Sequence, residues 1–450
     1  MERTDERNFM KEKKILPLVI SMALPMVISM AVNSLYNIVD SYFVAKISED
    51  AMTALSLVYP VQNLMTAIAV GFGVGMNARI AFCLGAKEKA HADSASVTGL
   101  LLSFIHGVVL MIVCIIFMPK FLSLYTESEE IIQMGLEYAD RAFLFSVIIM
   151  LGISFEKIFQ AVGRMKTTMV CMLVGFVVNI ILDPLMIFGI GSFPEMGMAG
   201  AAWATGIGQC ATLLVYILFI IIKPLPISFS AKNISFNKNL LKKLYAVGIP
   251  ASLNMALPSL QISALNGILS AFSDKYVLVL GAYYKLQTFI YLSANGIIQG
   301  IRPIVSFNYG AGETKRVHDT FKTTLALTAG VMALGVALSM IIPSQMIGLF
   351  TSSAETVGIG VKALRIISIG FVFSSVSVTC CGVLEALGRG AASLAVSFMR
   401  YAVVIIPAAY LFSRTALGAD GVFIAFPVSE MLTAAVSYLI YVKSMKKLKL

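Results

Sequence analysis

The sequence predicts an all-α membrane protein with many spanning helices, and three observations carry this prediction. Of its 450 residues, 58% are hydrophobic and only 13% are charged, and the mean hydropathy is +0.87, which lies outside the range of soluble domains. Several charge-free stretches exceed the roughly 20 apolar residues that cross a bilayer core. The two halves of the chain also resemble each other. Together these features exclude a soluble enzyme.

The first spanning helix is predicted over Ile15–Val39, behind a charged N-terminal tail. This stretch is too long for a removable signal peptide and lacks a small-residue cleavage site. Dividing the remaining hydropathy at charge clusters and at Gly or Pro predicts twelve spanning segments: residues 15–44, 52–82, 93–118, 131–160, 165–190, 197–222, 243–272, 276–308, 317–343, 355–386, 391–413 and 418–442.

Basic residues are distributed unevenly between the two sides of this predicted topology. Those outside the spans gather in both tails, in the 223–243 segment and in the loops on the same side. The opposite side has only Lys46, Lys120, Lys275 and Arg414. The positive-inside rule therefore predicts that both termini are cytoplasmic. The net charge of +10 is explained in this way, and no nucleic-acid partner is expected.

An internal repeat relates the two halves at an offset of 225 residues, half the chain length. Pro25 falls on Pro250, and the match continues without a gap through several later groups. These groups are Gly71 and Gly75 with Gly296 and Gly300, Gly85-Ala86 with Gly310-Ala311, and Ala161, Gly163 and Arg164 with Ala386, Gly388 and Arg389. Each half has six predicted spans, so the repeat is parallel.

The repeat predicts a domain organisation of two six-helix lobes, residues 1–222 and 244–450, joined by a basic cytoplasmic linker at 223–243. Parallel repeats of this kind are typical of secondary transporters. No Walker A motif occurs, so bound nucleotide is not the expected energy source. The HExxH and GxSxG motifs of membrane hydrolases are also missing from the sequence, and an enzyme is not predicted.

Acidic residues inside spans indicate function, because an aspartate near the bilayer centre costs roughly 2.5–3.5 kcal/mol. Three are identified, Asp40, Glu156 and Asp183, and their repeat mates are Leu265, Cys381 and Ala408. The sequence therefore predicts that functional acids belong to the N-terminal half alone.

Polar side chains accompany two of these acids at helical spacing. Asn33, Tyr36, Asn37 and Asp40 follow the i, i+3, i+4, i+7 pattern, which places them on one helix face. Such a face is not expected to contact lipid.

Asn179 and Asp183 share a face at i, i+4, and Pro184 frees the carbonyl oxygen of Ile180. With Thr205 after the next loop, these residues supply carboxylate, amide and hydroxyl oxygens suited to a small hard cation such as Na+, or to a shared proton. The alternative is structural: Asp183 only stabilises a proline kink, and Asp40 lies in a wet loop.

Twenty-five methionines and many aromatic residues could line an adaptable pocket for flat organic cations, although most of them are expected to serve helix packing. The six cysteines show no CxxC or other metal-ligand spacing, and they are interpreted as packing residues.

Several motifs resemble those of one known family. They are Pro25 fifteen residues before Asp40, Asn179-Ile-Ile-Leu-Asp183-Pro184, Gln299-Gly-Ile-Arg-Pro303, Asn308-Tyr-Gly-Ala311, and Ala-Val-Gly-Arg at 161–164 paired with Ala-Leu-Gly-Arg at 386–389. Over nearly its whole length the chain resembles the MATE (multidrug and toxic compound extrusion) family, and within it the MepA-like bacterial branch.

The resemblance implies twelve helices in two six-helix lobes that form a V. It further implies a monomer in the bacterial inner membrane that exports organic cations in exchange for H+ or Na+, without another cofactor. The family's N-lobe cation site carries over onto Asp40, Asn179, Asp183 and Thr205. Tyr36 and Tyr138 match polar positions that line the same lobe, and Asn33, Asn37 and Glu156 are further candidates for the substrate cavity.

Two functional hypotheses follow from this scaffold. The first is a cation-coupled multidrug antiporter that uses alternating access. The second is a flippase for a lipid-linked or amphipathic metabolite, for which a cationic cavity is expected. Only Lys285, Arg302 and Arg400 could contribute to such a cavity. A membrane-embedded enzyme or a non-transporting receptor has no support in the sequence.

Overall fold

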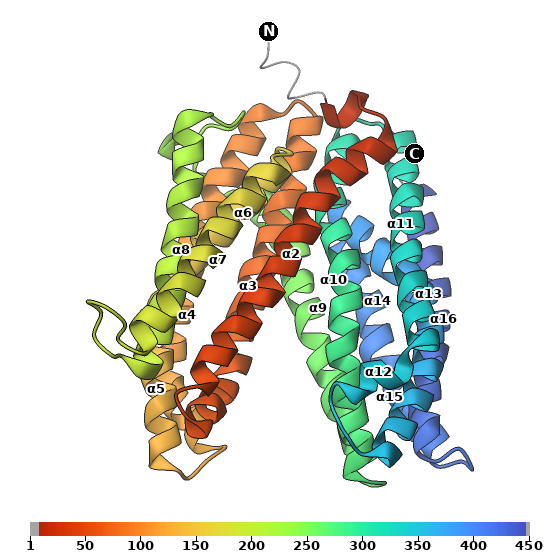
Figure 1. Cartoon of the computed structure of the whole chain (residues 1–450). Coiled ribbons are helices and arrows are strands. Elements are labelled where there is room, and N and C mark those ends of the chain that lie inside the picture. The colour runs from red at the N-terminus through yellow and green to blue at the C-terminus, as the bar shows by residue number, and fades with distance from the viewer. Residues whose placement is uncertain (1–8, 447–450) are drawn as a thin grey trace. The chain divides into compact units, whose positions relative to one another are not determined.

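The computed structural model describes residues 9–446, and every regular element among these residues is a helix (Figure 1). The helices of the first half are α2 (Ile15–Ala45), α3 (Glu49–Gly85), α4 (Lys89–Ser123), α5 (Glu129–Leu144), α6 (Ser146–Ala161), α7 (Met165–Ile187) and α8 (Gly197–Ile222). Those that follow are η1 (Ala231–Asn233), α9 (Lys238–Ser270), α10 (Asp274–Gly310), α11 (Thr314–Ile341), α12 (Pro343–Gly348), α13 (Ala354–Ala386), α14 (Gly390–Phe398), the π-helical η2 (Met399–Val404), α15 (Ile405–Ser413) and α16 (Ala419–Lys446).

The helix boundaries follow the 225-residue repeat. Helix α10 begins and ends 225 residues after α3, and α13 covers the positions that correspond to α5 and α6. The start signals repeat as well: Ser48 and Ser273 cap α3 and α10 by accepting hydrogen bonds from backbone N–H groups of the first turn. Residues 225 positions apart in the two halves therefore form equivalent local structure.

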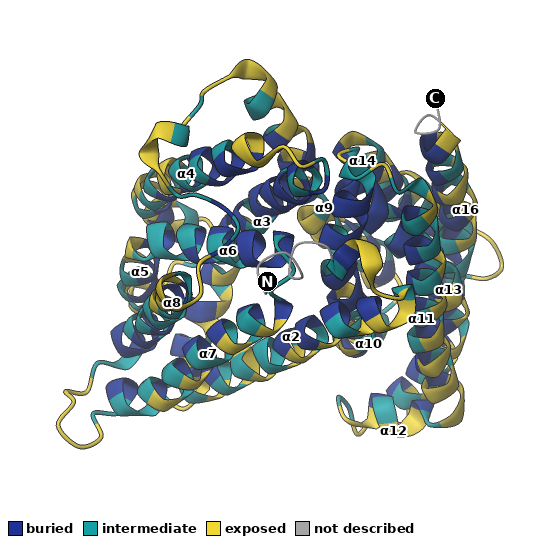
Figure 2. Ribbon diagram, turned by 90° about the horizontal axis from the view of Figure 1, so that it is seen from above, coloured by how far each residue is buried: buried dark blue, intermediate teal, exposed yellow. Residues whose placement is uncertain are grey.

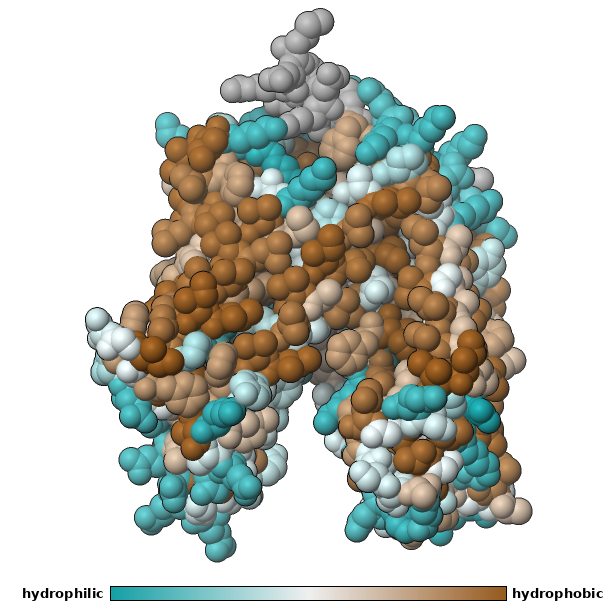
Figure 3. Space-filling view, viewed as in Figure 1, coloured by the Kyte–Doolittle hydropathy of each residue, from teal (hydrophilic) through white to brown (hydrophobic). Residues whose placement is uncertain are grey.

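Nine of the described helices are long and apolar enough to cross a membrane, and the α5–α6 pair raises this number to ten. Helices α9 and α10, with 33 and 37 residues, are also long enough to cross a membrane, but they are less apolar or more charged than these nine helices. In each unit, Figure 3 shows hydrophobic side chains along the middle of the helices and hydrophilic side chains at their ends. The chain is a multi-pass membrane protein. The predicted cytoplasmic placement of the two chain ends concerns residues outside the described part.

The halves differ where α5 meets α6. The two helices are bent by 49° at Phe145, whereas α13 runs through the equivalent positions without a break. The ring of Phe145 packs edge-on against Trp203 of α8 and covers Gly206 so closely that a Cβ there would overlap it. The break thus lies at a residue that packs against a neighbouring helix, a tertiary contact that hydropathy does not describe.

The described chain forms two compact units that divide inside helices. Unit 1 contains residues 28–252; unit 2 contains the described residues up to Val27 and those from Leu253 onward. The chain passes between the units at Val27–Ile28 in α2 and at Ser252–Leu253 in α9, each two residues after a proline. The units therefore do not follow the predicted division into 1–222, 223–243 and 244–450, because the first part of each crossing helix belongs to the other unit.

Close approaches between helices at glycine residues explain why the first part of each crossing helix belongs to the other unit. In unit 2, a Cβ at Gly296 of α10 would lie 2.7 Å from the Cα of Val27, and one at Gly300 would lie 2.7 Å from the backbone N of Ala23. In unit 1 the repeat mates Gly71 and Gly75 of α3 meet Ser252 and Leu244 of α9 with the same closeness. Only glycine permits such contacts, so the glycine pairs of the repeat mark where each crossing helix packs.

The predicted linker is attached to unit 1. The Asp93 carboxylate on α4 accepts a hydrogen bond from the backbone N of Ser228 at 2.8 Å, and Thr98 accepts one from Ser235 at 3.0 Å. Helix α3 lies in the interior of unit 1, because 72% of its apolar stretch is buried. Figure 2 shows long dark-blue stretches along this helix.

Candidate functional site

The residues predicted to bind a cation gather inside unit 1. Asp40 comes from α2, Asn179 and Asp183 from α7, and Thr205 from α8. Asp40, Asn179 and Asp183 are buried, with exposed fractions of 8%, 2% and 0%. Three helices therefore supply carboxylate, amide and hydroxyl groups to one region of unit 1.

Close packing of α7 on α8 brings these groups together. A Cβ at Gly208 of α8 would lie 2.8 Å from the carbonyl oxygen of Gly175 and 3.0 Å from the Cβ of Asn179. Within α7, Asn179 Nδ2 donates to Asp183 Oδ1 at 3.2 Å, and the close approach of α8 lets it also donate to Thr205 Oγ1 at 3.4 Å. The predicted link across the loop between α7 and α8 is therefore present.

Asp40 and Asp183 approach each other within hydrogen-bonding reach. Three buried oxygens in this cluster have no hydrogen-bond donor: Oδ1 of Asp40, Oδ2 of Asp183 and Oδ1 of Asn179. Buried polar atoms are nearly always paired in proteins. Unpaired acceptors that gather between two carboxyls are suited to a proton or a small cation.

Two tyrosines border the carboxyls. The hydroxyls of Tyr36 on α2 and Tyr138 on α5 both interact with Asp40, Asp183 and Thr205, and the Tyr36 ring stacks on Phe176 of α7 with centroids 5.2 Å apart.

A further residue of this cluster, Gln62 of α3, was not predicted. It donates from Nε2 to the Tyr138 hydroxyl at 3.1 Å. The polar pair Gln62-Asn63, close after Pro60 in an apolar span, was the signal that could have identified it.

Asn33 and Asn37 lie on α2 but bond to each other. Asn37 is exposed, and its Nδ2 donates at 2.8 Å both to the side chain and to the carbonyl oxygen of Asn33. Their role in a substrate cavity stays a prediction.

Glu156 lies in a different part of unit 1. Its Oε1 pairs with Lys157 Nζ at 2.6 Å and accepts from Gln160 Nε2 at 2.7 Å. None of these contacts joins it to the Asp40 and Asp183 carboxyls, so the structure does not place Glu156 with the predicted cation site.

Buried acids also occur in unit 2, whereas the acids identified inside spans from the sequence, Asp40, Glu156 and Asp183, all lie in the N-terminal half. In unit 2 the side chains of Glu385 and Glu430 are only 5% and 12% exposed. Each has a basic partner on another helix: Arg302 at 2.6 Å for Glu385 and Arg400 at 2.7 Å for Glu430. The sequence pattern did not reveal these acids because their partners lie 83 and 30 residues away.

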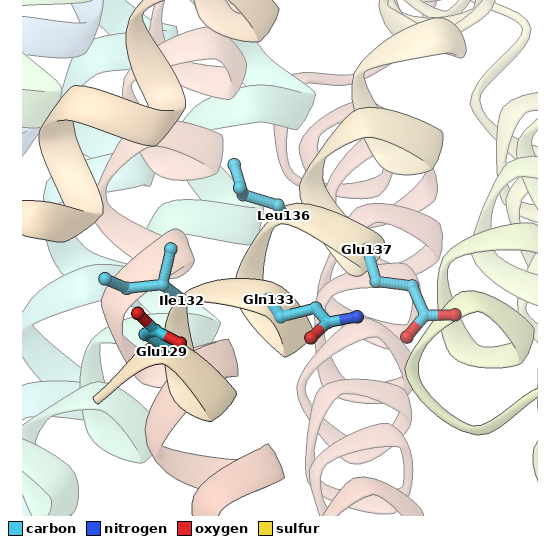
Figure 4. A pocket seen from close by; sticks show the side chains of 5 residues that line it. All are labelled: Glu129, Ile132, Gln133, Leu136 and Glu137. Atoms are coloured by element: carbon cyan, nitrogen blue, oxygen red, sulfur yellow. The ribbon is translucent and has the colours of Figure 1, made fainter.

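The donor set fits Na+ or H+ better than a transition metal. Among residues 9–446 no group of three or more His, Cys, Asp and Glu could hold a metal ion. Two carboxylates, an amide oxygen and a hydroxyl are hard oxygen ligands. A separate surface hollow, shown in Figure 4, is lined by one face of α5 alone, with Glu129, Gln133 and Glu137 as its polar residues, and shares none with the cluster.

Comparison with known proteins agrees with this architecture. The MatE family model matches residues 25–185 and again 250–411, which are copies at the repeat offset. The multidrug export protein MepA of Staphylococcus aureus (strain NCTC 8325 / PS 47) is 25% identical over 439 residues, covering 97% of this chain and 96% of that protein.

Two solved structures match equally well. One is an outward-facing multidrug resistance MATE family transporter of the MOP superfamily. The other is a MOP superfamily transporter from Pyrococcus furiosus Vc1 (DSM3638), described as having a binding pocket of reverse polarity that suggests a different function. Each has a TM-score of 0.91 and 25% identity and covers 99% of this chain and 98% of its own. The fold alone therefore does not select a substrate, but the double match of the family model covers most of the chain, which belongs to the MatE family.

Proposed function

We propose that this protein exports small organic cations from a bacterial cell in exchange for H+ or Na+, by alternating access. The curated relative in Staphylococcus aureus is a multidrug export protein that aligns over almost the full length of both chains. The proposal includes a monomer in the cell membrane with both termini cytoplasmic, as the distribution of basic residues predicts.

The observation that carries the proposal is that two buried acids lack the basic partner that the other buried acids have. Glu156, Glu385 and Glu430 each pair with a Lys or Arg. Asp40 and Asp183 approach each other, and no described basic side chain forms an ion pair with either. Two neighbouring bare carboxylates repel each other strongly in a low-dielectric interior, so the proposed mechanism places a proton or a cation between them.

The residues of the cluster have separate roles in this mechanism. Asn179 holds one oxygen of Asp183 and orients Thr205, while the unpaired oxygens face the coupling ion. Occupation of the cluster by the ion favours one arrangement of the helices, and binding of substrate favours the other. Exchange results when each ligand binds one arrangement more tightly than the other.

The alternative, a flippase for a lipid-linked or amphipathic metabolite, is less well supported. It needs free cationic groups to hold a phosphate. Arg302 and Arg400 each hold a carboxylate, and Lys285 Nζ lies 5.7 Å from the centre of the Phe350 ring. Two of these three basic residues are thus paired with carboxylates, which leaves few cationic groups to bind a phosphate.

Ethidium efflux from proteoliposomes tests the proposal. Wild-type protein should drive efflux under an imposed H+ or Na+ gradient, and Asp40→Asn should abolish it. Asp140→Asn is the matched control because Asp140 is an exposed aspartate of α5 in the same unit. Efflux at the wild-type rate in Asp40→Asn, or no efflux under either gradient, would reject the proposal.

A further inference from the structure

Polar residues occupy four repeat-related positions in both units and form a polar layer in each. In unit 1 it consists of Ser29, Asn77, Gln160 and Thr168, all at most 2% exposed. At the 225-residue offset, unit 2 has Asn254, Arg302, Glu385 and Ser393. The layer therefore has no charge at these positions in unit 1, whereas in unit 2 two of the four are charged.

Each unit nevertheless has one ion pair in this layer. In unit 1 the pair is Glu156–Lys157; Gln160 donates to Glu156 at 2.7 Å, and Asn77 donates to the Lys157 carbonyl oxygen at 3.0 Å. The repeat mates of Glu156 and Lys157 are Cys381 and Gly382. In unit 2 the ion pair is instead formed by Glu385 and Arg302, which are the repeat mates of Gln160 and Asn77.

The Glu385 carboxylate joins four helices of unit 2. Its Oε1 accepts from Asn254 Nδ2 of α9 and from Ser393 Oγ of α14, both at 3.0 Å. Its Oε2 accepts from Arg302 of α10 at 2.6 Å, and Glu385 itself lies on α13. Asn254 also donates to Ser393 at 3.1 Å. Such charge-assisted hydrogen bonds are about twice as strong as neutral ones.

The position of Asn254 links this network to movement of the two units. It is the second residue of unit 2 after the chain crosses from unit 1 at Ser252–Leu253. Any change in the relative arrangement of the units has to be accommodated at the two crossings within the described chain. The part of α9 that follows the crossing moves with unit 2 only if it is held there.

We propose that Glu385 is a positioning residue for transport, which as a carboxylate holds the unit 2 part of α9 against α10, α13 and α14. The inference rests on the proposed function, because its main readout is transport. It assigns Glu385 no contact with substrate or with the coupling ion.

The main test compares Glu385→Gln with Glu355→Gln in proteoliposomes, with rates normalised to folded protein. Both glutamates lie on α13 and pair with a basic residue of α10, but the Glu355–Lys275 pair is exposed and should contribute little. Glu385→Gln should lower the maximal rate by about tenfold, since it removes a charged partner from three hydrogen bonds, and leave KM within about twofold. Glu355→Gln should behave as wild type.

A double variant separates positioning from simple loss of folding. Arg302→Asn with Glu385→Gln reproduces the residues of unit 1 and leaves no unpaired charge. Because it still lacks the carboxylate that holds α9, it should stay about as slow as Glu385→Gln, and recovery of the wild-type rate would show that the loss came from the unpaired Arg302 instead. An unchanged maximal rate in Glu385→Gln, a loss only in the yield of folded protein, or an equal loss in Glu355→Gln would overturn the proposal.

A second readout does not depend on transport. Cys381 Sγ lies 3.8 Å from both Ser393 O and Ser397 Oγ, next to the network, whereas the neighbouring Cys380 is fully buried. Glu385→Gln should raise alkylation of Cys381 by N-ethylmaleimide severalfold relative to Cys380, measured by peptide mass spectrometry. If wild type transports nothing, the proposed function fails, while equal alkylation of Cys381 in wild type and variant overturns the positioning role itself.

Discussion

Asp40 of α2 and Asp183 of α7 lie within hydrogen-bonding reach of each other, and each retains a buried oxygen that has no donor. The amide of Asn179 reaches Asp183 from one turn away. This arrangement places two acids in one region of unit 1, and the predictions below test how it is built and what it does.

Replacing Asn179 by Ala should weaken the response to the coupling ion. The change removes the donor to Asp183 and Thr205 and an unpaired amide oxygen. Efflux should then require about a tenfold higher H+ or Na+ concentration for its half-maximal rate, as expected for the loss of a charge-assisted hydrogen bond. Asn239→Ala, at an exposed position in the first turn of α9, is the control; the same shift in both variants would contradict a specific role for Asn179.

Gly208→Ala should separate α7 from α8 and impair efflux. The added methyl group would lie 2.8 Å from the Gly175 carbonyl oxygen, so the backbones have to move apart, and the contact from Asn179 to Thr205 should be lost. Gly152→Ala in α6 is the matched control, because nothing lies within 4 Å of its Cβ. We expect a lowered melting temperature and efflux below wild type for the first variant alone, and a Gly208→Ala protein with normal efflux would be evidence against tight α7–α8 packing.

Gly388→Ala should lower the free energy of unfolding by about 1–2 kcal/mol, because Gly388 has a φ of 75° and a side chain is strained there. Gly330→Ala, inside α11 with open space around its Cβ, should be neutral or slightly stabilising. Thermal unfolding in detergent compares the two. Equal melting temperatures would show that the turn between α13 and α14 tolerates a side chain.

The Lys11–Glu313 ion pair should give a small pH-dependent contribution outside the spans. The hydrogen bond from Lys11 lowers the pKa of the Glu313 carboxyl. A lowered folded-state pKa means that stabilisation is complete above the ordinary glutamate pKa of about 4.3 and disappears as the pH falls through the lower value. Glu313→Gln should therefore lower the melting temperature slightly at pH 7 and not at acidic pH. A larger effect at acidic pH would have the wrong sign.

The sequence predicted the helices well because helix ends depend on local signals. Ser48 and Ser273 cap equivalent helices, and the glycine pairs of the repeat lie at close helix contacts. Residues at i, i+4 such as Asn179 and Asp183 are neighbours by helix geometry alone, so this part of the candidate site could be predicted.

Other features depend on tertiary contacts, which a single sequence does not reveal. The bend at Phe145 lies where this ring packs against Trp203 and Gly206 of α8. The pairing of Glu430 with Arg400 joins helices that hydropathy treats as separate apolar segments. The division into units inside α2 and α9 likewise depends on which helix each segment packs against.

The most direct test of coupling is counter-movement of the ion when substrate is the only imposed gradient. Proteoliposomes loaded with ethidium, with no H+ or Na+ gradient, would be diluted while internal pH and Na+ are followed with entrapped indicators. The account predicts that one of these cations moves opposite to ethidium in wild type and that neither responds in Asp40→Asn or Asp183→Asn. Ethidium movement in wild type without movement of either cation would contradict it.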